Sequence, residues 1–160
     1  MQNYLILGLG LFVATPVSAE PLFNETVNAW TVEEVFDACI AYNKPGETVG
    51  EIPERALVLV RDGDHATDLA VVFWPDALAE SDKALMVKVA GETHEYAAER
   101  SEDYDGLRFA LTDDVVATLA TLPKDASLTA RAVPSGSELQ FDVGDLPDVL
   151  ETLDRCEAAL

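Results

Sequence analysis

The feature that most constrains the fold of this chain is its pair of cysteines, Cys39 and Cys156, which lie near opposite ends of the sequence. Each falls on an apolar stripe at helical spacing, which places both on the buried side of their segments. In an exported domain this arrangement is typical of a disulfide. Two separate buried thiols are the alternative, whereas the lack of a Cys-x-x-Cys motif argues against a redox-active pair.

The N-terminal segment indicates export. Residues 1–19 contain no charged side chain, and the apolar run Leu5–Val13 is too short to span a bilayer. Val17-Ser18-Ala19 supplies the small residues of a peptidase site before Glu20. We therefore expect a signal peptide over 1–19, a single domain over 20–160 and a periplasmic or secreted location, with no membrane span after cleavage. The segment lacks Lys and Arg, and an uncleaved anchor or a buried N-terminal strand is the alternative.

The charge balance narrows the range of partners. Thirty Asp and Glu residues stand against ten Lys and Arg residues, so the formal net charge is −20. Such a chain does not supply the cations that nucleic-acid phosphates require, and anionic lipid repels it. The remaining interpretations are an acidic surface without a partner and a surface that meets a cationic protein. The oligomeric state stays open.

Three helices are predicted from apolar residues at helical spacing. The first begins at Thr31, where Glu34 completes a capping box, and ends at Asn43-Lys44-Pro45-Gly46. Trp30 before it is expected to anchor in the core. The second follows Thr112 or Asp113, and the third runs from Asp145 to Cys156. The apolar stripes are Val32, Val35, Phe36, Cys39 and Ile40; Val115, Val116, Leu119 and Leu122; and Leu146, Val149, Leu150, Leu153 and Cys156.

The remaining apolar segments predict strands. Residues 57–60 and 69–74 are apolar on both faces, which is typical of strands covered on both sides. The other strands are expected at 85–89, 93–100, 107–111, 128–133 and 139–143. The predicted fold class is therefore α+β: a mainly antiparallel, curved or sandwich-like sheet of about seven strands with three packed helices.

Residues with the potential for catalysis or metal binding do not form a recognisable motif. His65 and His94 are isolated and are expected at the surface. Two acidic groups beside glycine suggest calcium, but neither has the spacing of an EF-hand loop. We predict no catalytic residue, no metal site and no cofactor. The two acidic groups are Asp62, Asp64 and Asp68, and Glu102, Asp103 and Asp105.

The C-terminal end carries a family resemblance. A hairpin ending in Leu139-Gln140-Phe141-Asp142-Val143 precedes Gly144 and a helix of the form Val149-Leu150-x-x-Leu153-x-x-Cys156. This pattern resembles the end of the invasion-associated locus B family, small exported alphaproteobacterial proteins with a β-rich fold. The resemblance covers the final third and implies a similar compartment and a loosely similar sheet. A helix after Trp30 replaces the family's Trp-strand-Cys opening, and its central cysteines are missing, so no functional residue is transferred.

These observations favour an exported, non-enzymatic envelope or periplasmic protein with a binding or structural role. One alternative is an acidic inhibitor or scavenger of a cationic partner such as a lysozyme-type hydrolase, with acidic loops around Asp62-Asp64 or Glu102-Asp105 entering a basic cleft. The second alternative is a carboxylate-based hydrolase, which requires two carboxyl groups in one concave pocket. Because carboxylates are so abundant here, the sequence does not decide this point.

Overall fold

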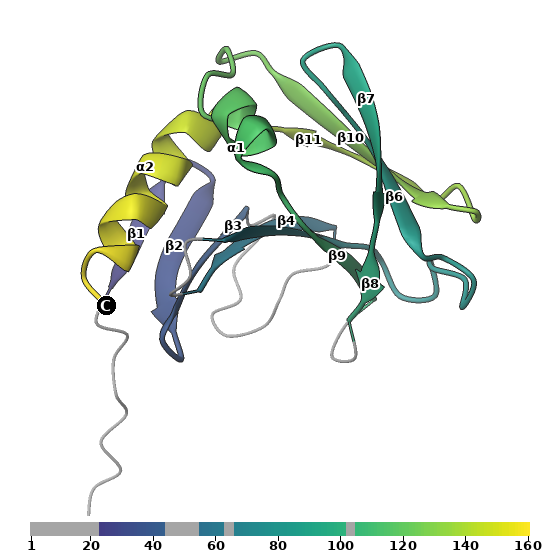
Figure 1. The fold of residues 1–160 in the computed structure, drawn as a ribbon, viewed down its shortest axis with the longest axis horizontal. Helices are drawn as coiled ribbons and strands as arrows, with labels where there is room; N and C mark the ends of the chain where they lie inside the picture. Colours follow the sequence, from purple (N-terminus) through teal and green to yellow (C-terminus); the bar gives the residue numbers. More distant parts are fainter. Residues whose placement is uncertain (1–22, 44–54, 63–65, 102–104) are drawn as a thin grey trace, which may run out of the picture.

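The structure, a computed structural model, describes residues 23–43, 55–62, 66–101 and 105–160. These residues form two antiparallel sheets and two helices, α1 (Asp113–Leu119) and α2 (Leu146–Glu157) (Figure 1). The larger sheet has the strand order β1 (Asn24–Val27), β2 (Trp30–Val35), β3 (Ala38–Asn43), β4 (Ala56–Arg61), β5 (Thr67–Val72), β9 (Gly106–Ala110) and β8 (Glu99–Arg100). The smaller sheet has the order β11 (Glu138–Asp142), β10 (Ser127–Val133), β6 (Ala84–Val89) and β7 (Glu92–Ala97).

One apolar core lies between these layers. Figure 1 shows the smaller sheet over one part of the larger sheet and α2 beside β1 and β2. Helix α2 contacts β1, β2 and β3, so it covers the part of the larger sheet that these three strands form. The fully buried side chains of this core include Trp30, Leu59, Leu69, Leu85, Leu107, Leu128 and Leu153. The predicted anchoring of Trp30 is confirmed, since only 1% of that residue is exposed.

Strands β4 and β5 are buried on both faces, as their continuous apolar runs predict. Leu57, Leu59 and Leu69 belong to the core between the layers. A second cluster lies on the opposite face of the larger sheet and consists of Ala56, Val58, Ala70 and Val72, with Ile40, Tyr42 and Val60 beside it. The central strands therefore lack the polar side that a sheet open to water on one face would show.

The predicted helix after Thr31 is wrong. Residues 30–43 form the hairpin β2–β3, with Val35 paired to Ala38 and Glu34 paired to Cys39. Trp30 and Val32 are buried, whereas the alternate residues of β2 are partly exposed, which is the period of a strand. The β-branched residues of this segment also favour extended backbone. Phe36, predicted on the buried stripe of the helix, is instead 99% exposed at the hairpin turn.

The α+β class and the antiparallel pairing are confirmed, but the numbers of helices and sheets differ from the prediction. The described residues contain two helices where three were predicted, and the strands divide between two sheets of seven and four. The predicted strand 93–100 is split, because β7 pairs with β6 in the smaller sheet and β8 pairs with β9 in the larger one. The sheets are thus joined by the short crossing at Ala98. The predicted signal peptide lies outside the described residues.

Candidate functional site

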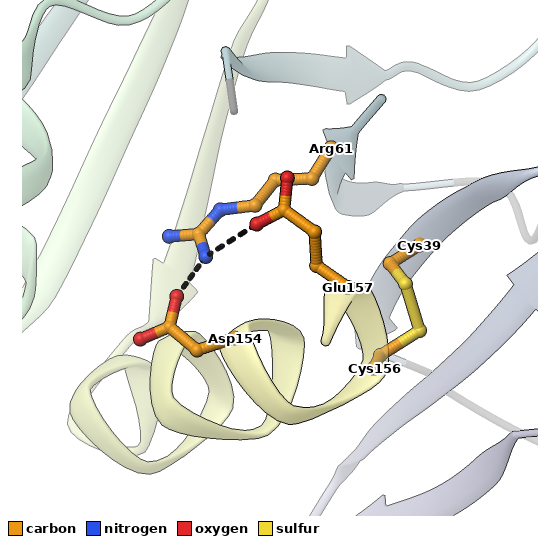
Figure 2. Close-up of a disulfide and its surroundings, with 5 residues drawn as sticks. All are labelled: Cys39, Arg61, Asp154, Cys156 and Glu157. Atoms are coloured by element: carbon orange, nitrogen blue, oxygen red, sulfur yellow. Dashed lines mark hydrogen bonds and ion pairs between the residues drawn. A yellow bond between two sulfur atoms is a disulfide. The ribbon is translucent and has the colours of Figure 1, made fainter. Parts of the chain in front are cut away.

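The predicted disulfide is present and links the two halves of the chain. Cys39 lies on β3, Cys156 lies in the last turn of α2, and their Cα atoms are 6.0 Å apart (Figure 2). Both residues are fully buried. Cys39 reaches this position from a strand and not from the expected helix. The bond therefore connects the hairpin β2–β3 to the helix that packs on it.

A buried arginine lies beside the disulfide. Arg61 is paired with Cys39 across β3 and β4 and is only 8% exposed. Its Nε donates to Thr67 Oγ1 at 3.0 Å, and its Nη1 donates to Asp154 and lies 3.8 Å from Glu157 Oε2 (Figure 2). A cation is favourable near the last carbonyls of a helix, so this position also suits the dipole of α2. The guanidinium is thereby neutralised within the fold.

Four further cations are paired with carboxylates within the fold. Arg100 pairs with Asp105 at 3.0 Å, Arg108 pairs with Asp68, and Arg155 pairs with Glu25 at 2.7 Å. Lys124 donates to Asp148 at 2.7 Å. The hydrogen bond to Asp148 raises the pKa of Lys124, and the hydrogen bonds to Glu25 raise the pKa of Arg155. Five of the nine described Lys and Arg residues thus have a carboxylate partner.

The acidic groups considered for calcium lie apart or pair with arginine. Asp68 binds Arg108, and Asp105 binds Arg100 and accepts the Asp76 N–H. Asp62 is exposed, while Asp64, His65, Glu102 and Asp103 lie outside the described residues. No cluster of three potential metal ligands occurs in the described part of the chain. His94 is half-exposed on β7, 3.2 Å from the carboxylate of Glu92.

Two of the hollows on the described surface are lined partly by polar side chains. The larger, about 390 Å³, lies over β6, β10 and β11 and is lined by Lys88, Thr129 and Gln140 together with the loop before β10. The smaller, about 290 Å³, lies near Trp30 and is lined by both Asp142 and Asp145. Asp142 accepts a hydrogen bond from the Gly144 N–H, and Asp145 accepts one from Asn28 Nδ2 at 2.9 Å. These two carboxylates therefore hold the loop that leads into α2.

The exposed tip of the hairpin β2–β3 was missed by sequence reasoning. Among the described residues, two large apolar side chains are exposed, Phe36 and the terminal Leu160. The spacing of Val32, Val35 and Phe36 suits a helix, and this hid the tip. The signal that could have revealed it is the alternation of apolar Trp30 and Val32 with polar Thr31 and Glu33.

Comparison with known proteins shows the fold. No family model matches the chain, and no curated protein matches it. The crystal structure of invasion associated protein B from Bartonella henselae matches with a TM-score of 0.60 at 13% sequence identity. The match covers 85% of this chain and 99% of that chain. The likeness in fold therefore extends over most of this chain.

One expected departure from that family is wrong. Trp30 begins β2 and Cys39 lies on β3, so a strand and not a helix follows Trp30 and leads to the cysteine-bearing strand. Neither of the two described helices is long and apolar enough to cross a membrane.

Proposed function

We propose that this chain is an exported, non-enzymatic binding protein whose partner is a cationic protein. The disulfide supports export, because such bonds persist in oxidising compartments. The fold likeness to an invasion associated protein is consistent with the same location. The predicted signal sequence over 1–19 points in the same direction.

The observation that carries the proposal is the distribution of charge. Most of the described cations are held in ion pairs, including the buried Arg61, so the fold neutralises much of its own positive charge. The carboxylates outnumber the cations threefold, and the net charge of −20 must lie largely on the surface. A surface of this kind attracts and orients a basic partner and repels nucleic acid and anionic lipid.

Helix α2 shows this distribution locally. Asp148, Glu151 and Asp154 are exposed on its solvent side at intervals of three residues. Like charges at this spacing destabilise a helix by a few tenths of a kcal/mol per pair. The packing of the apolar side of α2 and the disulfide offset this cost. Asp148 and Asp154 each bind one cation of the fold, Lys124 and Arg61, and the row remains exposed to a basic partner on its solvent side.

A titration against basic and neutral proteins tests the proposal. Oxidised protein comprising residues 20–160 would be titrated calorimetrically with lysozyme, with poly-lysine and with a neutral protein, at about 20 and about 300 mM NaCl. We expect saturable binding to the two cationic probes that weakens at least tenfold at the higher salt concentration. Absence of binding to both probes at low salt would refute the function. Lysozyme activity in the same samples distinguishes an inhibitor from a scavenger.

A further inference from the structure

The tip of the hairpin β2–β3 combines exposure with a rare backbone conformation. Val35 pairs with Ala38, so Phe36 and Asp37 form a two-residue loop. Their φ angles are +49° and +63°, the left-handed region, which aspartate tolerates and which a bulky residue such as phenylalanine rarely adopts. Phe36 is 99% exposed, so its ring has no contact within the fold that would compensate for this conformation.

Two other two-residue hairpin loops in the described chain also have positive φ at their first residue, and their sequences can be compared with this one. The loop Asn28-Ala29 joins β1 to β2, and the loop Ala90-Gly91 joins β6 to β7. Their first residues also have positive φ, +52° in both Asn28 and Ala90. Asparagine, which turn chemistry favours, occupies that position in the first loop, and alanine occupies it in the second. Phenylalanine at the same position of the β2–β3 loop is therefore not a requirement of the turn.

The tip is held firmly by its surroundings. Cys39 lies three residues beyond Phe36 and is bonded to α2. On the other strand, the Glu34 N–H donates to the Phe23 carbonyl oxygen at 3.0 Å. An aromatic ring on a rigid hairpin loses little conformational entropy on binding, and this is a usual property of an interface anchor.

The charges near the tip select the partner. Asp37 is exposed beside Phe36, Glu33 is partly exposed on β2, and no cation occurs among residues 23–43. An acidic rim repels anionic lipid and repels a second copy of a chain whose net charge is −20. It is complementary to a basic surface around an apolar pocket.

We propose that Phe36 is the anchor by which this protein docks on its cationic partner, with the ring in an apolar pocket and Glu33 and Asp37 facing the basic rim of that pocket. This proposal rests on the proposed function, because it assigns the contact point of the same interaction. It adds a requirement that charge alone does not impose, namely a partner with a pocket for an aromatic ring.

Two variants and a matched control test the anchor. Phe36→Ala removes the ring. The double variant Phe36→Asn with Asp37→Gly introduces the preferred residues of this turn. Ala90→Asn makes a comparable change in the β6–β7 loop. Each is titrated with lysozyme, which has a cleft, and with poly-lysine, which has charge but no pocket.

We expect Phe36→Ala and the double variant to weaken lysozyme binding at least about tenfold, as for a central interface aromatic. The double variant should have a melting temperature equal to or above that of the wild type, so lost binding with retained stability excludes unfolding. Poly-lysine binding should change less than about twofold in Phe36→Ala, and Ala90→Asn should bind lysozyme as the wild type does.

Several outcomes would overturn the anchor. If wild type and Phe36→Ala bind lysozyme equally while both bind poly-lysine, the anchor fails and the charge-based function stands. If the wild type binds neither probe, both proposals fail. A wild-type dimer that Phe36→Ala dissociates, seen by analytical ultracentrifugation, would assign the tip to self-association. Flotation with phosphatidylcholine vesicles that requires Phe36 would assign it to a membrane.

Discussion

Reduction of the Cys39–Cys156 disulfide should lower stability strongly without unfolding the protein at room temperature. The two cysteines are 117 residues apart in the sequence. In the chain-entropy model a loop of this length is worth about 5 kcal/mol at 25 °C. A domain of roughly 140 residues unfolds with an entropy of about 0.3 kcal/mol/K. The expected fall in melting temperature is therefore roughly 15 °C.

The apolar side of α2 explains why the reduced protein should remain folded. Leu146, Val149, Leu150 and Leu153 are buried in the core between the layers whether or not the sulfurs are joined. Their burial contributes several kcal/mol on the usual scale for apolar side chains, about 1.5–3 kcal/mol each as an upper estimate. Helix α2 should thus stay docked at 25 °C, and its release should coincide with global unfolding.

Thermal unfolding followed by circular dichroism, with and without a phosphine reductant, measures the effect. Mass spectrometry after alkylation must show two free thiols in the reduced sample. The double variant Cys39→Ala with Cys156→Ala should melt near the reduced wild type and should not respond to reductant. Equal melting temperatures for verified oxidised and reduced wild type would refute the reasoning that this bond constrains the unfolded chain.

Three further predictions concern groups outside the disulfide. Burial of Asp82 raises its pKa, but the hydrogen bonds it accepts from the Ser135 and Ala79 N–H groups outweigh this effect and lower the pKa below its ordinary value of 3.8. The stability that Asp82 contributes is therefore present above pH 3.8 and is lost as the pH falls through the folded-state pKa. In urea titrations, the difference in unfolding free energy between wild type and Asp82→Asn should shrink as the pH is lowered below 3.8. Arg61→Met removes the hydrogen bonds to Thr67 and Asp154 and should lower the free energy of unfolding by about 1–3 kcal/mol; an unchanged urea midpoint would contradict this. Gly144→Ala places a Cβ against the main chain of Lys124 and should lower the free energy of unfolding by more than about 2 kcal/mol or prevent folding. In Gly91→Ala the new Cβ meets nothing within 4 Å, so the loss should be only about 1 kcal/mol, caused by the positive φ of that position. Equal melting temperatures for the two variants would refute this difference.

The hairpins with clear turn residues were predictable from local sequence. The runs 57–60 and 69–74 pair as β4 and β5, and the segments 128–133 and 139–143 pair as β10 and β11. In each case apolar or alternating runs stand on both sides of a short polar stretch, and neighbouring antiparallel strands need only a turn to meet. The C-terminal helix was equally clear, because its apolar stripe extends over three turns behind Pro147.

The division into two sheets was not predictable in the same way. Strands β5 and β9 are neighbours in the larger sheet, yet the hairpin β6–β7 of the other sheet lies between them in the chain. Local periodicity reports which face of a strand is apolar and not which sheet the strand joins. That choice depends on contacts between distant segments.

What the sequence alone determined is that Cys39 and Cys156 take inward-facing positions, and hence the disulfide between them. What only the tertiary structure decided is the conformation of residues 31–40. A short segment with apolar residues at 32, 35, 36 and 39 satisfies both a helical stripe and half of a strand pattern. The pairing of β3 with β4 resolves this ambiguity, because backbone groups of Cys39 and Ala41 meet those of Arg61 and Leu59. That pairing moves Phe36 from a predicted core position to the exposed tip.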